Sequence, residues 1–113
     1  MLTATSAASG AAWGAKLKGH DTRVLVYFGE GSSSRGQFHS ALNFASIHKL
    51  PLILLCENNG WAISVPTERQ MGNPRIAERA AGYGMPRDRF DARARCRRRT
   101  VLGSMAPLGL PQR

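Results

Sequence analysis

Residues 24–61 read "VLVYFGEGSSSRGQFHSALNFASIHKLPLILLCENNGW" and carry two apolar runs on either side of an amphipathic segment. The first run, within residues 23–28, lacks alternation and predicts a strand covered on both faces. Residues 34–48 predict a helix with one apolar face, because apolar side chains recur at i, i+3, i+4 and i+7. These side chains belong to Phe38, Ala41, Leu42 and Ala45. Pro51 prevents the helix from continuing, and "LILLC" at 52–56 predicts a second buried strand. The order predicts a βαβ unit in an α/β fold, with a parallel sheet and flanking helices.

Parallel strands bring the loops that follow them to the same edge of the sheet. Glu30 follows the first strand and Asn59 the second. Their separation is close to the roughly 30 residues of a βαβ unit, so we expect them to face one crevice. A carboxylate, an amide oxygen and backbone carbonyls suit Mg²⁺, whose coordination is usually completed by phosphates and water. Gly31 and the serines after it offer backbone N–H groups for phosphate, and Ser32–Ser34 offer hydroxyl N-caps for the helix.

Simpler interpretations exist for the same residues. A glutamate between two glycines is commonly a solvated loop carboxylate, and Asn-Gly commonly marks a turn. Two other phosphate motifs fail, because Ser34 stands where a dinucleotide fingerprint has its third glycine and no Gly-Lys-Ser/Thr follows.

The flanking segments differ in character. Residues 4–18 are rich in Ala, Ser and Gly and end at Gly19, which predicts a helix that other elements approach closely. A short helix is predicted to start at Asn73 as N-cap with Pro74 as its first residue, and to end at Gly82 or Gly84.

The charge divides the chain in two. Of the net charge of +9, the residues up to Pro86 carry eight basic against five acidic side chains, whereas eight arginines oppose two aspartates from Arg87 onward. We therefore expect one partial domain over residues 1–86 and an Arg-rich tail over 87–113 that is disordered or out-of-frame sequence.

Neither cysteine suggests a disulfide framework or a metal-ligand spacing, and a reducing compartment fits best. Cys56 closes a buried strand and is expected to be a small core residue. No apolar segment approaches the roughly 18 residues that span a bilayer, and no membrane partner is expected.

"YFGEGSSSRGQFHSALNFASIHKLPLILLCENNGWAISVPTERQ" and the later "RIAERAAGYGMP" together resemble the α subunit of the E1 component of thiamine diphosphate-dependent 2-oxo acid dehydrogenases. This group includes the branched-chain, pyruvate and acetoin enzymes. The resemblance covers roughly residues 10–86. It implies that the chain is a fragment of the thiamine diphosphate-binding fold.

The resemblance also implies a cofactor site. Glu30 and the side-chain oxygen of Asn59 would bind Mg²⁺, together with the backbone carbonyl of Trp61. The diphosphate of thiamine diphosphate would be held by Gly29, Gly31 and Ser32, and Ile63 would lie by the cofactor. None of these residues would be a catalytic acid or base.

By the same resemblance, the reaction is oxidative decarboxylation of a small 2-oxo acid with transfer of the acyl group to a lipoyl domain of the E2 acyltransferase. Gly-Glu-Gly favours a branched-chain substrate. An E1 β subunit would be the partner in a heterotetramer, in the cytoplasm or, in a eukaryote, the mitochondrial matrix.

The family's upstream segments, its "VDGND"-like turn and its histidine loop have no counterpart in the sequence. We therefore expect a truncated chain that binds the cofactor weakly by itself. One alternative is an inactive remnant that only associates with an E1 β partner. Another is a nucleic-acid-binding module using the basic tail, but nucleic acid is not the expected partner because Phe90 is the tail's only aromatic residue.

Overall fold

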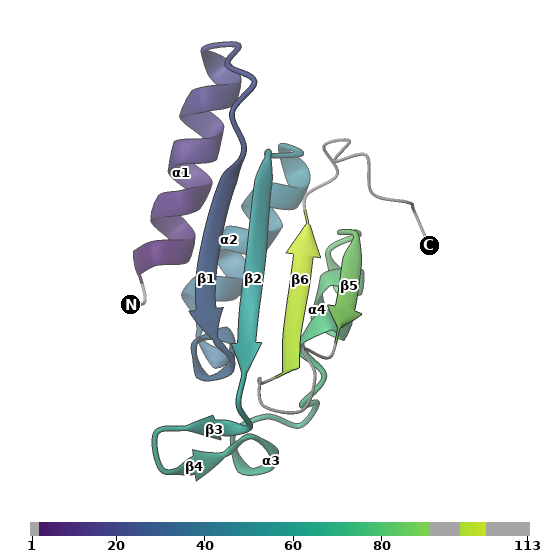
Figure 1. Ribbon diagram of the computed structural model, residues 1–113. Helices are drawn as coiled ribbons and strands as arrows, with labels where there is room; N and C mark the ends of the chain where they lie inside the picture. Colours follow the sequence, from purple (N-terminus) through teal and green to yellow (C-terminus); the bar gives the residue numbers. More distant parts are fainter. Residues whose placement is uncertain (1–2, 91–97, 104–113) are drawn as a thin grey trace.

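The computed structural model describes residues 3–90 and 98–103 as an α/β arrangement with one main sheet (Figure 1). The elements in chain order are α1 Thr3–Leu17, β1 Val24–Gly29, the 3₁₀ helix η1 Glu30–Ser34, α2 Gly36–Ile47, β2 Leu52–Asn58, β3 Trp61–Ala62, β4 Val65–Pro66, α3 Thr67–Gln70, α4 Ile76–Gly82, β5 Arg87–Phe90 and β6 Arg98–Gly103.

The predicted βαβ unit is confirmed. β1 and β2 pair in parallel, from Val24 opposite Leu52 to Gly29 opposite Glu57, and α2 connects them. The predicted apolar face of α2 is also correct, since its buried residues are Phe38, Ala41, Leu42 and Ala45. Leu42 is fully buried, and burial of such a side chain contributes about 1.5–3 kcal/mol.

The core lies on one face of the sheet. Val26 and Phe28 of β1 and alternate residues of β2 join one buried cluster with side chains of α1, α2 and α4. On the opposite face Leu25 and Tyr27 are 49% and 54% exposed. The expectation that β1 is covered on both faces is therefore wrong among the described residues. An unbroken apolar run leaves open whether the second face is covered.

The small-residue helix is confirmed as α1, and its Ala8 and Ala12 are buried in the core. Gly19 ends the turn with a φ of 69°, in the left-handed region that glycine adopts easily. Trp13 packs against Phe44, with ring centroids 5.7 Å apart. The Nζ of Lys16 donates to the carbonyl of His48, which ties the ends of α1 and α2 together.

A small hairpin lies beyond the carboxyl ends of β1 and β2. β3 and β4 pair antiparallel, and α3 follows directly (Figure 1). Neither the hairpin nor α3 was predicted, because each spans only two to four residues. Their position places them next to η1.

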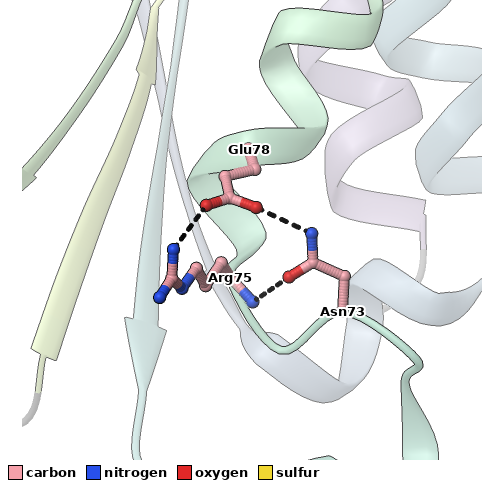
Figure 2. Close-up of polar contacts among 3 residues, drawn as sticks. All are labelled: Asn73, Arg75 and Glu78. Carbon is pink, nitrogen blue, oxygen red and sulfur yellow. Dashed lines mark hydrogen bonds and ion pairs between the residues drawn. The ribbon is translucent and has the colours of Figure 1, made fainter.

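The predicted short helix is present as α4, but it begins at Ile76 rather than at Pro74. Asn73 is not its N-cap. The Oδ1 of Asn73 accepts the N–H of Arg75 at 2.9 Å, and the Nδ2 donates to Glu78 at 2.8 Å. Figure 2 shows these contacts with the Arg75–Glu78 ion pair, which together close the turn before the helix.

Part of the Arg-rich segment forms strands. β6 pairs antiparallel with β2, and β5 pairs antiparallel with β6, so the sheet order is β1-β2-β6-β5. The expectation of disorder therefore differs from the structure at 87–90 and 98–103, where pairing of β6 with β2 and of β5 with β6 supplies partners that composition does not reveal. The rest of this segment, 91–97 and 104–113, lies outside the described residues. That the segment is out-of-frame stays a prediction.

Within the described part of the chain, every helix is too short or too polar to cross a membrane.

Candidate metal and diphosphate site

Glu30 begins η1 directly after β1 and is 2% exposed. Its Oε1 accepts the backbone N–H of Trp61 at 2.7 Å, across 31 positions of sequence. A carboxylate this deeply buried requires hydrogen-bond donors or a cation as partners. Glu30 is therefore not the solvated loop carboxylate of the simpler interpretation.

The two asparagines after β2 have different roles. The Oδ1 of Asn58 accepts the N–H of Gly60 at 2.9 Å, an Asx turn that the φ of 82° at Gly60 completes. The Oδ1 of Asn59 instead accepts the N–H of Trp61 at 2.8 Å. Glu30 and Asn59 therefore meet at one N–H group, as the parallel topology predicts, and their oxygens lie no farther apart than the sum of the two distances.

Trp61 contributes its backbone to the same place. In the β3–β4 ladder it lies opposite Pro66, next to the hydrogen bond from the Thr67 N–H to the Gly60 carbonyl at 3.0 Å, so the backbone groups of Trp61 point away from β4. The side chain of Trp61 is 54% exposed. The structure thus brings the side-chain oxygens of Glu30 and Asn59 together at the backbone N–H of Trp61, whereas the predicted ligand atom of Trp61 is its carbonyl oxygen.

The predicted phosphate-binding residues lie in and beside η1. A Cβ added to Gly31 would be 2.8 Å from the Cβ of Ala62, so only glycine lets η1 pack this closely against β3. A Cβ added to Gly29 would meet nothing within 4 Å. The expectation that Ser32–Ser34 supply the N-cap of α2 is wrong. These serines belong to η1, and Arg35, which precedes α2, makes no side-chain cap hydrogen bond.

Ile63 lies between β3 and β4 with a φ of 60° and a fully exposed side chain. A β-branched residue rarely adopts this conformation, which costs about 1–2 kcal/mol relative to glycine. Within the described part of the chain, Ile63 therefore has a strained backbone and an apolar side chain that no other residue covers.

Three further side chains hold η1, and sequence reasoning missed all of them. The Oγ of Ser33 donates to the carbonyl of Glu30 at 2.6 Å. The Nε2 of Gln70 donates to the carbonyl of Gly31 at 3.2 Å and to the Oγ of Ser34 at 3.0 Å. The Nη1 of Arg79 donates to the carbonyl of Ser33 and, at 2.9 Å, to its Oγ. The only available signal was that Gln70 and Arg79 lie in the segments that carry the family resemblance.

Cys56 lies within β2, two residues before its end, and is fully buried, which confirms its predicted place in the core. Burial, and next the negative charge of Glu30, raise the pKa of the Cys56 thiol to about 12, while Arg79 acts in the opposite direction. The thiol is therefore neutral and unsuited to nucleophilic or metal-binding work at neutral pH.

The arrangement supplies hard oxygen ligands. Nowhere in residues 3–90 and 98–103 do three His, Cys, Asp or Glu side chains gather in a way that could hold a metal ion. A cation here would instead take one carboxylate, one amide oxygen and a backbone carbonyl. That set suits Mg²⁺ when other oxygens complete the coordination.

Comparisons with known proteins place the sequence in a family. The sequence profile of the family described as "Dehydrogenase E1 component" matches residues 1–93. The chain is 49% identical over 86 residues to the 2-oxoisovalerate dehydrogenase subunit alpha of Bacillus subtilis, an overlap that covers 76% of this chain and 26% of that protein.

Two further relatives bear similar names. Identity is 44% over 89 residues with the 3-methyl-2-oxobutanoate dehydrogenase subunit alpha of Mycobacterium tuberculosis, covering 79% of this chain and 24% of the relative. Identity is 43% over 91 residues with the mitochondrial 2-oxoisovalerate dehydrogenase subunit alpha of Homo sapiens, covering 80% of this chain and 20% of that protein. The chain thus spans about a quarter or less of the length of these relatives.

Proposed function

The chain belongs to the dehydrogenase E1 component family, and from that membership we propose that residues 3–90 are the part of an E1 α subunit that holds Mg²⁺ and the diphosphate of thiamine diphosphate. The carrying observation is that the oxygens of Glu30 and Asn59 meet at the N–H of Trp61. Both retain further lone pairs, so they can turn from this N–H to a cation without rearrangement of the strands.

In this proposal Glu30, Asn59 and the carbonyl of Trp61 bind Mg²⁺, and the diphosphate supplies further oxygens. Two buried oxygens of α3, Thr67 Oγ1 and Gln70 Oε1, have no hydrogen-bond partner among the described residues. Unsatisfied buried groups beside η1 are what a site completed by a ligand or ordered water would have.

The diphosphate would lie against the backbone of Gly29, Gly31 and Ser32, where the open space beside the Cα of Gly29 allows close approach. Ile63 would pack against the organic part of the cofactor, which would give its exposed side chain a partner. Thiamine diphosphate, when bound, supplies the carbanion chemistry of 2-oxo acid decarboxylation. The residues named here bind and orient it, and none of them transfers a proton.

The whole protein would be a 2-oxo acid dehydrogenase E1 component. The names of the relatives favour a branched-chain 2-oxo acid as substrate. An E1 β subunit and the lipoyl domain of an E2 acyltransferase would be its partners, in the bacterial cytoplasm or the mitochondrial matrix.

Mn²⁺ tests this site, because it replaces Mg²⁺ and broadens NMR signals near it. We expect Mn²⁺ with thiamine diphosphate to broaden the amide signals of residues 29–31 and 59–61 of the ¹⁵N-labelled chain, with weak affinity. Glu30→Ala and Asn59→Ala should abolish this broadening. Glu68→Gln is the matched control, since Glu68 is an exposed carboxylate on neighbouring α3. Broadening that is uniform over the chain, or unchanged in Glu30→Ala, would contradict the proposal.

A further inference from the structure

The segment that carries Glu30 is not stable by itself. η1 has five residues, and its N-cap, Gly29, makes no side-chain hydrogen bond. A 3₁₀ helix has poorer hydrogen-bond geometry than an α-helix and is used in short pieces. Contacts from other elements must therefore fix the position of Glu30.

The contact from α4 reaches the centre of η1. Arg79 lies 46 positions from Ser33, and its Nη1 donates to both the carbonyl and the Oγ of Ser33. Ser33 is fully buried, so water does not compete for these atoms. The helix that carries Arg79 is held in place, because the buried side chains of α4 pack in the core. These belong to Ile76, Ala77 and Ala80.

The guanidinium also sets the direction of the Ser33 hydroxyl. Arginine has five N–H donors and no acceptor, so the Oγ of Ser33 must accept from Arg79. Its single proton is then available to the carbonyl of Glu30 at 2.6 Å, or to the Sδ of Met71 at 3.7 Å. The carbonyl of Glu30 is the closer and stronger acceptor, so the Ser33 hydroxyl donates to it. Arg79, Ser33 and Glu30 therefore form one directed chain of hydrogen bonds.

We infer that Arg79 is a positioning residue for Glu30: it acts through Ser33 to hold the carboxylate where it meets Asn59 and Trp61. The inference deepens the proposed function and rests on it for the identity of the ligand. Arg79 has no other role in the site described above. Its guanidinium is half-buried and has no ion pair within residues 3–90, whereas Arg75, just before the same helix, is exposed and pairs with Glu78 at 3.1 Å (Figure 2).

The hydrogen bond between Glu30 and Trp61 can be measured without any metal. The backbone amide of Trp61, in the ¹⁵N-labelled full chain, reports it through its chemical shift and its exchange with solvent. We expect Arg79→Gln to shift this amide and to remove its protection. Arg75→Gln, which also removes an arginine beside α4, should leave the amide unchanged. In Arg79→Lys the shift and the loss of protection of the Trp61 amide should be smaller than in Arg79→Gln, because lysine keeps the charge but not the planar fork of donors.

Metal affinity gives the second readout. Loss of a group that orients a metal ligand typically costs about 10–100-fold in affinity, so Arg79→Gln should weaken Mn²⁺ binding by that factor and Arg75→Gln should not. Circular dichroism establishes that each variant is folded. Where Arg79→Gln does not fold, Ser33→Ala removes the relay and leaves Arg79 in place, with the same expected effect on Trp61.

The outcomes separate the two proposals. An unchanged Trp61 amide in folded Arg79→Gln and Ser33→Ala would overturn the role of Arg79, whatever the metal does. If the wild-type chain binds no Mn²⁺ at Glu30 while the Trp61 amide responds as expected, the positioning role stands and the metal site fails.

Discussion

The carboxylate of Glu30 lies 2.7 Å from the backbone nitrogen of Trp61, so the loop after the first strand of the sheet is bonded to the loop after the second. Asn59 accepts the same N–H at 2.8 Å. One donor shared by two acceptors is weaker for each of them than a separate bond, which leaves both oxygens able to bind a cation. In the proposed site the two oxygens would therefore be held together before a cation binds, and such preorganisation would lower the free-energy cost of binding.

The close contact of η1 with β3 predicts the effect of Gly31→Ala. The new methyl group would lie 2.8 Å from the Cβ of Ala62, so η1 and the hairpin must separate. We expect a loss of about 1–3 kcal/mol in the free energy of unfolding, measured by urea denaturation, and weaker Mn²⁺ binding. Gly10→Ala is the control, because its Cβ would meet nothing within 4 Å inside α1. That change should stabilise the chain by about 0.5–1 kcal/mol. Equal effects of the two substitutions would contradict the argument.

The backbone of Ile63 predicts that Ile63→Gly raises the stability of the chain. Ile63 has a φ of 60° and buries none of its side chain, so glycine removes strain without loss of packing. After subtraction of the entropy cost of glycine, the expected gain is at most about 1 kcal/mol. Ile47→Gly, at an exposed position at the end of α2, should instead lower the stability, by up to about 1 kcal/mol. Thermal unfolding of both variants measures the difference.

The same variant also tests the role of Ile63 in the proposed site. If Ile63 packs against the cofactor, Ile63→Gly should bind thiamine diphosphate with Mn²⁺ less tightly although it is more stable. A variant that is stabilised and keeps full cofactor affinity would remove Ile63 from the site.

The βαβ unit was predictable because its signals are local. The spacing of Phe38, Ala41 and Leu42 is a property of one helix, and two apolar runs mark the strands around it. Parallel pairing then places Glu30 and Asn59 at the same edge of the sheet without further information. The convergence of the site therefore follows from topology, and it was predicted correctly.

The supports of the site were not predictable in this way. Gln70 and Arg79 bond to η1 across 36 to 46 positions, and nothing in their local sequence indicates a partner. The exposed face of β1 was missed for a related reason. Leu25 and Tyr27 are as apolar as their buried neighbours, so composition does not distinguish the covered face from the open one.

The turn before α4 predicts a pH dependence of stability. The hydrogen bond from Asn73, and then the contact with Arg75, hold the pKa of Glu78 below its usual value. Because the pKa is lower in the folded chain than in the unfolded chain, ionised Glu78 stabilises the fold above its unfolded pKa. This stabilisation is lost as the pH falls through the folded pKa.

Urea midpoints measured from neutral to acid pH check the sign. The difference between the wild-type chain and Glu78→Gln should be constant near neutrality and shrink below about pH 4. In a chain that carries Asn73→Ala, the stability difference made by Glu78→Gln should be mostly lost, because the hydrogen bond that contributes most to the lowered pKa of Glu78 is gone. A difference that grows on acidification would mean that the shift has the opposite sign.

The burial of Cys56 predicts that its thiol resists alkylation while the chain is folded. With a pKa of about 12, it is almost entirely protonated at pH 8, whereas an unfolded cysteine is partly ionised. We expect iodoacetamide to label the Cys56 peptide on the order of a thousandfold more slowly in the native chain than in guanidinium, as measured by mass spectrometry of that peptide. Glu30→Gln should speed native labelling, because it removes the charge that, after burial, contributes most to the raised pKa. Native labelling at the denatured rate would mean that β2 opens faster than the reagent reacts, and would place Cys56 outside the core.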